Sequence, residues 1–366
     1  MGKRELFIIL GFVVVGVLAY QLTAPAATSE EGFSFSKIWQ AMRREVRGNP
    51  SRAEYTHTGS FEAPATLTEV RFADVSRLRV IGEARQDVGY ELKVESNGPD
   101  DQHALEYAKR SVLKTDDMGG ALTLRVEYPP EARQTSELVV KVPLRMNVRV
   151  QGGSRLEATN VASIRLEGVT STVKIASIAG AVTGSHRGGD LDVSGAGAVR
   201  LTLSGSQAKF QEVRQALTLD MRNTECEIEE PKGTVEIEEI NSRITIADPA
   251  GPVRVGGERG RVVVNAPQAE IRVDVRRAEV EVSLKASVPL TLVTTDEELR
   301  LVLDGPPAIE IDAVASNGSI STPGLDDLKP ETTDRETRLT HSFGKNATVR
   351  ASLRNLRGEI VIRMAK

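Results

Sequence analysis

A regular beat of short strand-like runs is the feature that most restricts the fold of this 366-residue chain. Between residues 151 and 323, apolar and polar residues alternate in short runs, and each new run begins 8 to 11 residues after the previous one. Alternation with a period of two is typical of a β-strand that buries one face. About nine residues hold one strand and one tight turn, and a unit of this size cannot bury its own apolar face. The repeat therefore predicts an all-β fold, a β-solenoid of ~9-residue strand-turn units in which neighbouring units stack.

Within each run, the apolar residues are predicted to point into the stack and the polar residues to face water. The predicted inward residues include Leu166, Ile175, Val193, Leu201, Leu219, Ile228, Ile237, Ile246, Val264, Val273, Val282 and Leu301. Glycines between the runs, such as Gly168, Gly188 and Gly205, are expected to supply the positive φ of the corners. Two strands per coil need about 18 residues and three strands need about 27, and the sequence leaves both geometries open.

The segments on either side of the repeat also alternate like strands. Residues 57–150 are expected to form a β-rich head that caps the N-terminal end of the solenoid, with one short helix at residues 103–114. The apolar side of that helix holds Ala104, Leu105, Ala108 and Val112. Residues 324–366 are expected to form a polar loop followed by capping strands, whose arginines and lysines would discourage the addition of further strands.

The N-terminus contains one long apolar run at residues 6–22, preceded by Lys3 and Arg4. The positive-inside rule places such an N-terminus in the cytoplasm and exports the rest of the chain. We therefore predict an N-terminal transmembrane helix within residues 1–28. A signal peptide cleaved near Ala24-Pro25-Ala26 is the alternative.

Residues 29–56 are expected to be a juxtamembrane amphipathic helix or a linker, since Trp39 and its apolar neighbours recur at helical spacing among arginines. The expected location of the protein is the cytoplasmic (inner) membrane, crossed once, with the bulk of the chain periplasmic or extracellular. The expected partners are the lipid bilayer, through the N-terminal helix, and an envelope protein or other surface partner.

Composition argues against several classes of function. A net charge of -4 argues against a nucleic-acid-binding protein, which normally carries a strongly basic face. A single cysteine, Cys226, excludes an intramolecular disulfide and a multi-cysteine metal site, and its phase in the strand predicts a buried position. Aromatic residues make up only 4% of the chain, which argues against the stacking platforms of sugar-binding enzymes.

Four local patterns are candidates for sites, and none is predicted to be one. The acidic run Asp296-Glu297-Glu298 is interpreted as a turn, and the glutamates between Glu225 and Glu239 as an outward acidic face. Ser185-His186-Arg187 lacks an acidic partner or an elbow motif, so His186 is interpreted as an exposed turn histidine. The glycine pairs, Gly256-Gly257 among them, are interpreted as corners. No catalytic, cofactor-binding or metal-binding residue and no cofactor is predicted.

The order of these segments resembles the bacterial β-strand-repeat "putative adhesin" family, whose members are exported β-solenoid proteins of unknown activity. The residues that carry the resemblance are ELVVKVPLRMNVRV at 137–150, the glycine-punctuated repeats, and FGKNATVRASLRNLRGEIVIR at 343–363. The resemblance covers residues 72–364. It implies the architecture and a role in surface interaction, and it supplies no catalytic residue.

The sequence thus predicts a non-enzymatic, membrane-anchored, exported β-solenoid that serves as an adhesion, interaction or scaffold protein of the cell envelope. One alternative is an envelope stress sensor that works with a membrane regulator. A further alternative is a β-helix enzyme acting on carbohydrate, which would need clustered carboxylates and usually aromatic platforms.

Overall fold

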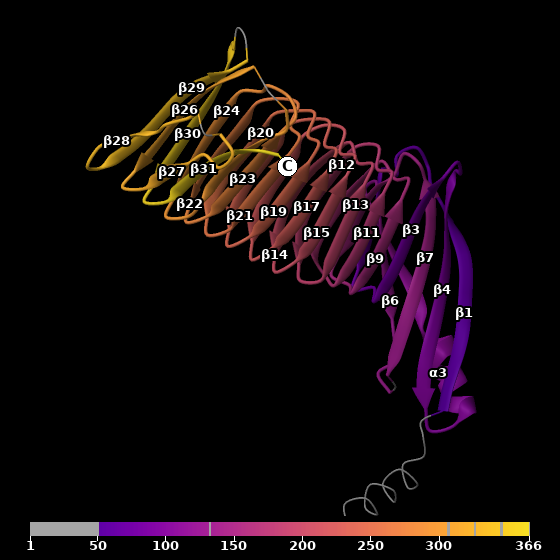
Figure 1. Cartoon of the computed structure of the whole chain (residues 1–366). Helices are drawn as coiled ribbons and strands as arrows, with labels where there is room; N and C mark the ends of the chain where they lie inside the picture. The colour runs from indigo at the N-terminus through magenta and orange to yellow at the C-terminus, as the bar shows by residue number, and fades with distance from the viewer. Residues whose placement is uncertain (1–50, 132, 306–307, 326, 345–346, 366) are drawn as a thin grey trace, which may run out of the picture. The chain divides into compact units, whose positions relative to one another are not determined.

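Successive strands of the repeat alternate between two large sheets that lie face to face and enclose the core (Figure 1). The computed structural model describes residues 51–366 except 132, 306–307, 326, 345–346 and 366, and the described part belongs to one unit, Ser51–Lys366. One short helix, α3 (Asp101–Arg110), is the only helix of the described residues. We call the 15-stranded sheet sheet A and the 16-stranded sheet sheet B.

The strands of both sheets are given in spatial order. Sheet A contains β1 (Ser51–Glu62), β4 (Asp87–Gly98), β7 (Gln134–Pro143), β3 (Arg77–Glu83), β9 (Arg155–Thr159), β11 (Thr172–Ala176), β13 (Asp190–Ser194), β15 (Gln207–Gln211), β17 (Glu225–Glu229), β19 (Arg243–Ala247), β21 (Arg261–Asn265), β23 (Glu279–Leu284), β25 (Leu299–Leu303), β31 (Glu359–Met364) and β27 (Ser319–Ser321). Sheet B contains β28 (Glu331–Thr332), β29 (Glu336–Phe343), β26 (Ile309–Ser316), β30 (Val349–Leu356), β24 (Leu290–Thr295), β22 (Ile271–Arg276), β20 (Val253–Glu258), β18 (Val235–Ile240), β16 (Leu217–Arg222), β14 (Ala198–Ser204), β12 (Ala181–Arg187), β10 (Ser163–Thr170), β8 (Asn147–Gln151), β2 (Glu69–Ala73), β6 (Ala121–Glu127) and β5 (Val112–Met118).

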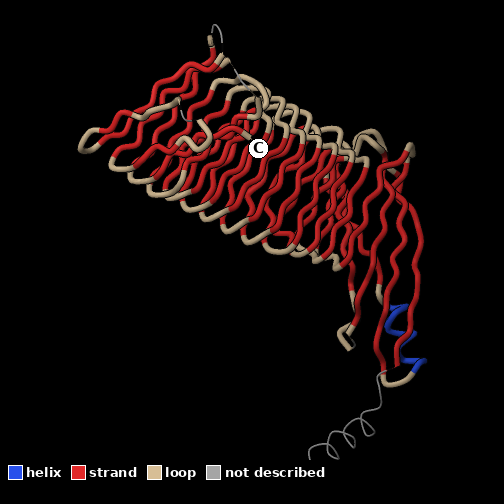
Figure 2. The backbone as a smooth tube through the Cα atoms, viewed as in Figure 1, coloured by secondary structure: helices blue, strands red, loops and turns tan. Residues whose placement is uncertain are grey.

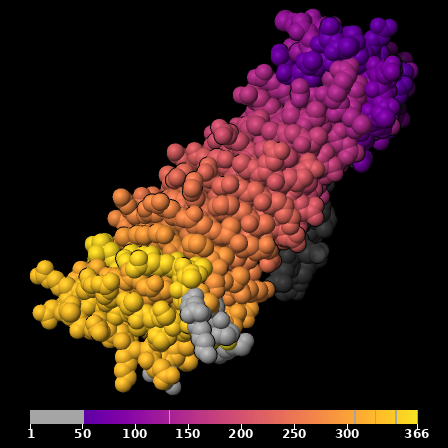
Figure 3. Space-filling view, turned by 90° about the horizontal axis from the view of Figure 1, so that it is seen from above, coloured from indigo at the N-terminus to yellow at the C-terminus, as the bar shows by residue number. Residues whose placement is uncertain are grey.

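Each coil of the solenoid holds two strands, one in each sheet, which settles the number of strands that the sequence left open. In the middle of sheet B, Val199 of β14 pairs with Leu217 of β16, and Leu217 pairs with Val235 of β18. Every step here is parallel and advances the chain by one coil of 18 residues. The coils therefore follow one another in chain order, as the successive bands of colour show (Figure 3).

The core is a set of aliphatic columns that run along the solenoid axis. All twelve predicted inward residues are at most 2% exposed, so the predicted strand phase is confirmed. Parallel pairing in register places each inward residue directly beside the equivalent residue of the next coil. Burying a side chain such as Ile237 contributes roughly 1.5–3 kcal/mol. Since no coil can gain this burial alone, the stack as a whole stabilises each coil.

The corners differ from the prediction, because many of them need no glycine. After the sheet A strands, positive φ values recur at 18-residue spacing at Glu212, Glu230, Asp248 and Ala266. After the sheet B strands, the same holds for Asn223, Asn241, Arg259 and Arg277. Each corner N–H donates to a carbonyl of the next coil, for example Asn241 to Glu258 at 2.8 Å. This inter-coil bond recurs in every coil and offsets the cost of the left-handed backbone.

The predicted helix at residues 103–114 is shorter and begins earlier than expected. The Asp100 side chain accepts a hydrogen bond from the His103 N–H at 2.9 Å and caps the N-terminus. The helix ends at Arg110, because Val112 begins β5, which pairs antiparallel with β6. Ala104 and Ala108 are buried as predicted, whereas Val112 is exposed.

At both ends of the solenoid, the coils leave chain order. At the N-terminal end, β6 and β7 lie outside β2 and β3, although they follow them in the chain. At the C-terminal end, β30 and β31 lie between the coil of β24 and β25 and the coil of β26 and β27. The strands of the predicted capping segment therefore include an interior coil. Antiparallel strands close three of the four sheet ends, with β4 and β1 on β7, β5 on β6, and β29 and β28 on β26 (Figure 2, strands in red). At the C-terminal end of sheet A, the outermost strand is the short β27, which is parallel to β31.

The predicted fold class needs one correction. It combined an all-β solenoid with an N-terminal transmembrane helix, whereas the structure is an all-β protein of two large sheets and one short helix. Across the described residues, no helix is long and apolar enough to cross a bilayer. The segments for which the transmembrane helix and the juxtamembrane helix were predicted, residues 1–28 and 29–50, lie outside the described residues, and β1 begins at Ser51.

Candidate functional site

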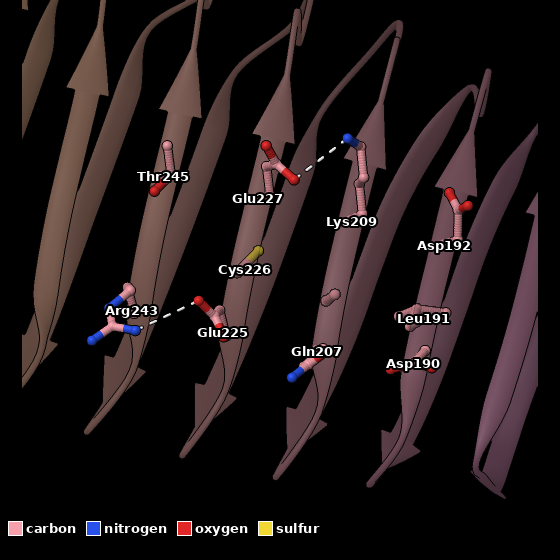
Figure 4. A pocket seen from close by; sticks show the side chains of 11 residues that line it. Asp190, Leu191, Asp192, Gln207, Lys209, Glu225, Cys226, Glu227, Arg243 and Thr245 are labelled. Carbon is pink, nitrogen blue, oxygen red and sulfur yellow. Dashed lines mark ion pairs between the residues drawn. The ribbon is translucent and has the colours of Figure 1, made fainter.

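The outer face of sheet A carries a shallow depression of about 500 Å³ over four neighbouring strands, β13, β15, β17 and β19 (Figure 4). Parallel pairing in register arranges its polar side chains in two straight rows. The first row consists of Asp190, Gln207, Glu225 and Arg243, and the second of Asp192, Lys209, Glu227 and Thr245. Neighbouring members of a row are separated by about 4.8 Å, the spacing between strands of a sheet.

Ion pairs between adjacent strands hold these rows in place. Arg243 Nη1 lies 3.6 Å from Glu225 Oε1, and Lys209 Nζ lies 3.4 Å from Glu227 Oε2. Lys209 also donates to Glu229 Oε1 at 2.7 Å. That bond raises the pKa of Lys209 and lowers the pKa of Glu229. Four carboxylates line the depression against two cationic side chains, so its charge is negative.

The floor of the depression contains no reactive group. Cys226 points into the core between Ala208 and Ile244 of the adjacent strands and is 2% exposed, which confirms its predicted burial. Burial raises the pKa of its thiol, so the thiolate form is disfavoured. The arrangement can therefore bind through charge and hydrogen bonds, but it offers no nucleophile.

A second depression, of about 510 Å³, lies on the outer face of sheet B. Its rim includes Glu238 and Asp274 on strands that flank β20, where the outward position is Gly256. Because Gly256 has no side chain, the row is interrupted there; a Cβ atom at this position would lie 2.9 Å from Glu238 Oε2. Gly256 and Gly257 thus lie inside a strand, and the interpretation of this pair as a corner was wrong.

His186 is buried and not an exposed turn residue as expected. It is 1% exposed at the end of β12, where Nδ1 lies 3.0 Å from Ser206 Oγ and Nε2 lies 3.0 Å from the carbonyl oxygen of Ser171. Burial lowers its pKa, although the bond to Ser171 and the charge of Asp190 act in the opposite direction. Alternation within β12 places His186 in the same inward phase as Val182, opposite the buried Leu203 of β14, so the sequence interpretation failed by assigning His186 to a turn.

Glu239 is a buried titratable residue that the sequence interpretation missed. It was grouped with an outward acidic face, yet it points inward and is 2% exposed. Its Oε2 accepts a hydrogen bond from the Ser242 N–H at 2.9 Å, while Oε1 has no partner among the described residues. Burial raises the pKa of Glu239 to about 7. The signal was present in the sequence, since Glu238-Glu239 breaks the alternation of β18.

Two glycines make the space that Glu239 occupies. A Cβ atom at Gly257 would lie 2.2 Å from the Glu239 carbonyl oxygen, and one at Gly260 would lie 2.9 Å from Oε2. One and two coils earlier, the position equivalent to Gly260 is a buried Ser242 or Thr224, whose hydroxyl bonds to the carbonyl two residues before it. In this corner, the Glu239 carboxyl group therefore occupies the space beside Gly260, where the two earlier coils have a serine or threonine hydroxyl.

The predicted acidic run Asp296-Glu297-Glu298 lies at a corner. Arg357 donates two hydrogen bonds to Asp296, at 2.6 and 2.9 Å, and this hydrogen bonding lowers the pKa of Asp296. Arg300 forms an ion pair with Glu298. Over the part of the chain that the structure describes, no group of three or more histidine, cysteine, aspartate or glutamate side chains is placed to hold a metal ion.

No protein-family description and no curated protein sequence matches this chain. Among solved structures, the chain is similar to a "putative cell adhesion protein" from Clostridium sporogenes, with 10% identity, a TM-score of 0.19, and coverage of 86% of this chain and 100% of the other. It is also similar to a "putative adhesin" from Parabacteroides distasonis, with 10% identity, a TM-score of 0.33, and coverage of 87% and 98%. A "putative lipid binding protein" from the same organism gives 13% identity, a TM-score of 0.21, and coverage of 85% and 97%.

Two of these descriptions agree in name with the family that the sequence resembles. At these identities and TM-scores, the three structures carry no argument about the activity or the partners of this chain. The candidate site rests on the geometry of the two outer faces.

Proposed function

We propose that this protein is a non-catalytic interaction protein of the cell envelope, which binds its partner through the outer face of sheet A. The observation that carries this proposal is the pair of straight charged rows over β13 to β19, held in register by inter-strand pairing and ion pairs. A rigid face of this kind is already ordered before binding, so little conformational entropy is lost when a partner docks. Its excess of carboxylates favours a basic partner.

The state of the carboxyl groups on the two sheets explains why binding, and not catalysis, is proposed. Hydrolysis of a glycoside needs two carboxyl groups on either side of the scissile bond, one of them protonated. Glu225 and Glu227 both lie on the sheet A face, but each forms an ion pair. Glu239 has the raised pKa of a general acid, but its carboxyl group lies inside a corner of the solenoid and is 2% exposed.

A location outside the cytoplasm belongs to the same proposal. It is supported by the apolar run at residues 6–22 after Lys3 and Arg4, a pattern that directs export. Protease accessibility of the described strands in spheroplasts, in which only the cytoplasmic membrane remains sealed, would test it, and full protection of the chain would contradict it.

The binding proposal is tested by charge reversal on one face. In a sedimentation assay with isolated cell envelopes of the producing bacterium, Glu225→Lys/Glu227→Lys should reduce the bound fraction at least about fivefold, because it inverts the charge of the face. The matched control is Glu236→Lys/Glu238→Lys on the outer face of sheet B, which should bind as the unmodified protein does. Binding of the unmodified protein should also weaken as salt rises. Equal loss in both variants would reject the sheet A face, and turnover of an envelope glycan would reject the non-catalytic role.

A further inference from the structure

The outermost strands of the two sheets differ greatly in length. Among the described residues, four strands have a neighbour on one side only, namely β1, β5, β27 and β28. They contain 12, 7, 3 and 2 residues. An outermost strand presents unpaired N–H and C=O groups that can pair with another chain, and proteins usually keep such strands short or cover them. β1 is the exception, because it is long and none of its 12 residues has a strand neighbour on the outer side among the described residues.

β1 contacts its neighbours on both faces, although none of its residues is buried. It pairs antiparallel with β4 along its full length, from Ser51 opposite Gly98 to Glu62 opposite Asp87. On one face, His57 Nε2 lies 3.5 Å from the Ala108 carbonyl oxygen of α3, and the ring of Phe61 stacks on that of Tyr90 with centroids 5.2 Å apart.

On the other face of β1, two ion pairs connect it to β4. Lys93 Nζ lies 2.8 Å from Glu54 Oε1, and Arg52 Nη1 lies 3.3 Å from Glu95 Oε1. Arg52 keeps most of its side chain exposed, at 72%. Glu62, on the same face at the far end of the strand, forms no ion pair within the described chain, although it is exposed. The face therefore carries an accessible cation at one end and an accessible carboxylate at the other.

These features match a second copy of the same strand. A two-fold axis perpendicular to the sheet places two β1 strands antiparallel, and residues directly opposite each other must then point to the same face. Among the registers that engage most of the strand, the one with His57 on the axis places Arg52 opposite Glu62 of the partner subunit, twice by symmetry. With Thr58 on the axis, Glu54 would lie opposite the partner subunit's Glu62, which places like charges together. With Thr56 on the axis, Arg52 would lie opposite the uncharged Ser60 of the partner subunit.

The other face of β1 fits the same register. Tyr55, which is 36% exposed, would lie opposite Gly59 of the partner subunit and diagonal to the partner subunit's Phe61. Diagonal neighbours across two strands are within reach of aromatic side chains. The exposed ring of Tyr55 would therefore extend the stack that Phe61 and Tyr90 already form.

We propose that β1 is the contact strand of a symmetric dimer, in which sheet A of one copy continues into sheet A of the next. The occupant of the open edge is a second copy of this chain, with Arg52 opposite Glu62 of the partner subunit. This inference does not depend on the proposed binding role of the sheet A face, because it concerns the edge of the sheet and not its surface.

Cysteine cross-linking of the full chain tests both the dimer and its register. In the proposed register, Thr56 lies opposite the partner subunit's Thr58, so copies carrying Thr56→Cys and Thr58→Cys, with different tags and mixed or co-expressed, should form a mixed disulfide on mild oxidation. Either variant alone should give no cross-link, and Cys226, buried in the core, should give no background. Cross-linking of Thr56→Cys or Thr58→Cys to itself would overturn the register.

Charge exchange gives a second readout that does not need oxidation. Arg52→Glu and Glu62→Arg should each raise the dimer dissociation constant about tenfold or more, as measured by mass photometry, and Arg52→Glu/Glu62→Arg should restore it. Asp116→Lys on β5 is the control and should leave the constant unchanged. A full chain that stays monomeric at micromolar concentration without cross-linking overturns the proposal, as does capture of a different protein by the Thr56→Cys edge.

Discussion

The middle of the solenoid and its two ends are built from the same kind of strand, yet they are assembled by different rules. From β10 to β23, each strand pairs in parallel with the strand one coil earlier and the strand one coil later, in chain order. At the ends, the chain order changes and a later coil enters beside an earlier one. Antiparallel strands close both ends of sheet B and the N-terminal end of sheet A. A coil in the middle packs its aliphatic side chains against an equivalent coil on each side. A terminal coil has such a neighbour on one side only, so other strands must cover its exposed side.

The contrast also extends to chemistry. The middle contains aliphatic columns with a few buried polar groups at the corners, of which His186 and Glu239 are the titratable ones. Ion pairs lie on the outer surface of both regions, but at the C-terminal end they include a buried carboxylate. At the C-terminal end, Asp312 is buried under Arg354, Arg338 and Arg350, with Arg354 Nη2 2.7 Å from Asp312 Oδ2. The charges at that end therefore hold a closing strand and its neighbours together.

The largest expected effect compares two deletions of equal length. Removing residues 217–234 takes out one middle coil and brings Ala198–Ser204 beside Val235–Ile240 in the same phase, so the chain should still fold. Removing residues 349–366 takes out β30 and β31 and leaves β26 without its parallel neighbour. The four fully buried residues lost there, Ala351, Leu353, Ile360 and Ile362, contribute more than about 5 kcal/mol together.

Urea titration and limited proteolysis would measure this difference. The C-terminal deletion should lower the unfolding midpoint far more than the middle deletion and expose β26 and β29 to protease. If the two deletions cost the same free energy, the ends are not special and the comparison fails.

A single substitution in the middle tests the aliphatic columns. Ile237→Asp would place an unpaired carboxyl group in a column of aliphatic side chains and should lower the free energy of unfolding by about 3–5 kcal/mol. Glu238→Lys, the next residue along and facing water, should change it by about 0.5 kcal/mol or less. Denaturant titration of both variants would show the contrast, and equal effects would mean that the strand phase is wrong.

The pH dependence of stability tests the buried carboxyl group in the middle. Because the pKa of Glu239 is about 7 in the folded protein and about 4.5 in the unfolded chain, the folded state binds the extra proton between these values. Stability should therefore fall as pH rises from about 4.5 to about 7, by on the order of 3 kcal/mol in this contribution. Glu239→Gln should remove that slope. A variant with the same pH profile as the unmodified protein would show that Glu239 is not the titrating group.

The smallest expected effect concerns His186, which acts with the opposite sign. Its pKa is lowered by burial, so the unfolded chain binds a proton more readily and stability should fall as pH drops below about 6.5. His186→Gln should flatten this acid-side loss without affecting the slope due to Glu239. Thermal unfolding between pH 5 and pH 7 would separate the two, and an unchanged acid-side slope would assign it to other groups.

The sequence by itself determined the repeating strand-turn unit and which residues of each strand face the core. The beat predicted strands that alternate between buried and exposed residues, and every predicted inward residue from Leu166 to Leu301 is buried, because the burial of a strand face depends only on local alternation. Cys226 was placed in the core for the same reason. The sequence also resembles a family with this architecture, while its composition predicted no reactive site.

Tertiary structure decided what depends on neighbouring coils. The sequence could not distinguish two strands per coil from three, because both geometries use the same nine-residue unit. They differ only in whether a strand pairs with the strand about 18 or about 27 residues further along the chain. The order of the coils at the ends, the open edge of β1 and the alignment of Asp190 with Arg243 across four strands arise from pairing between distant segments. Glu239 and His186 lie in the inward phase of their own strands, but alternation does not reveal what accommodates a polar side chain there. The space at Gly260 beside Glu239, and the Ser171 and Ser206 partners of His186, belong to neighbouring coils.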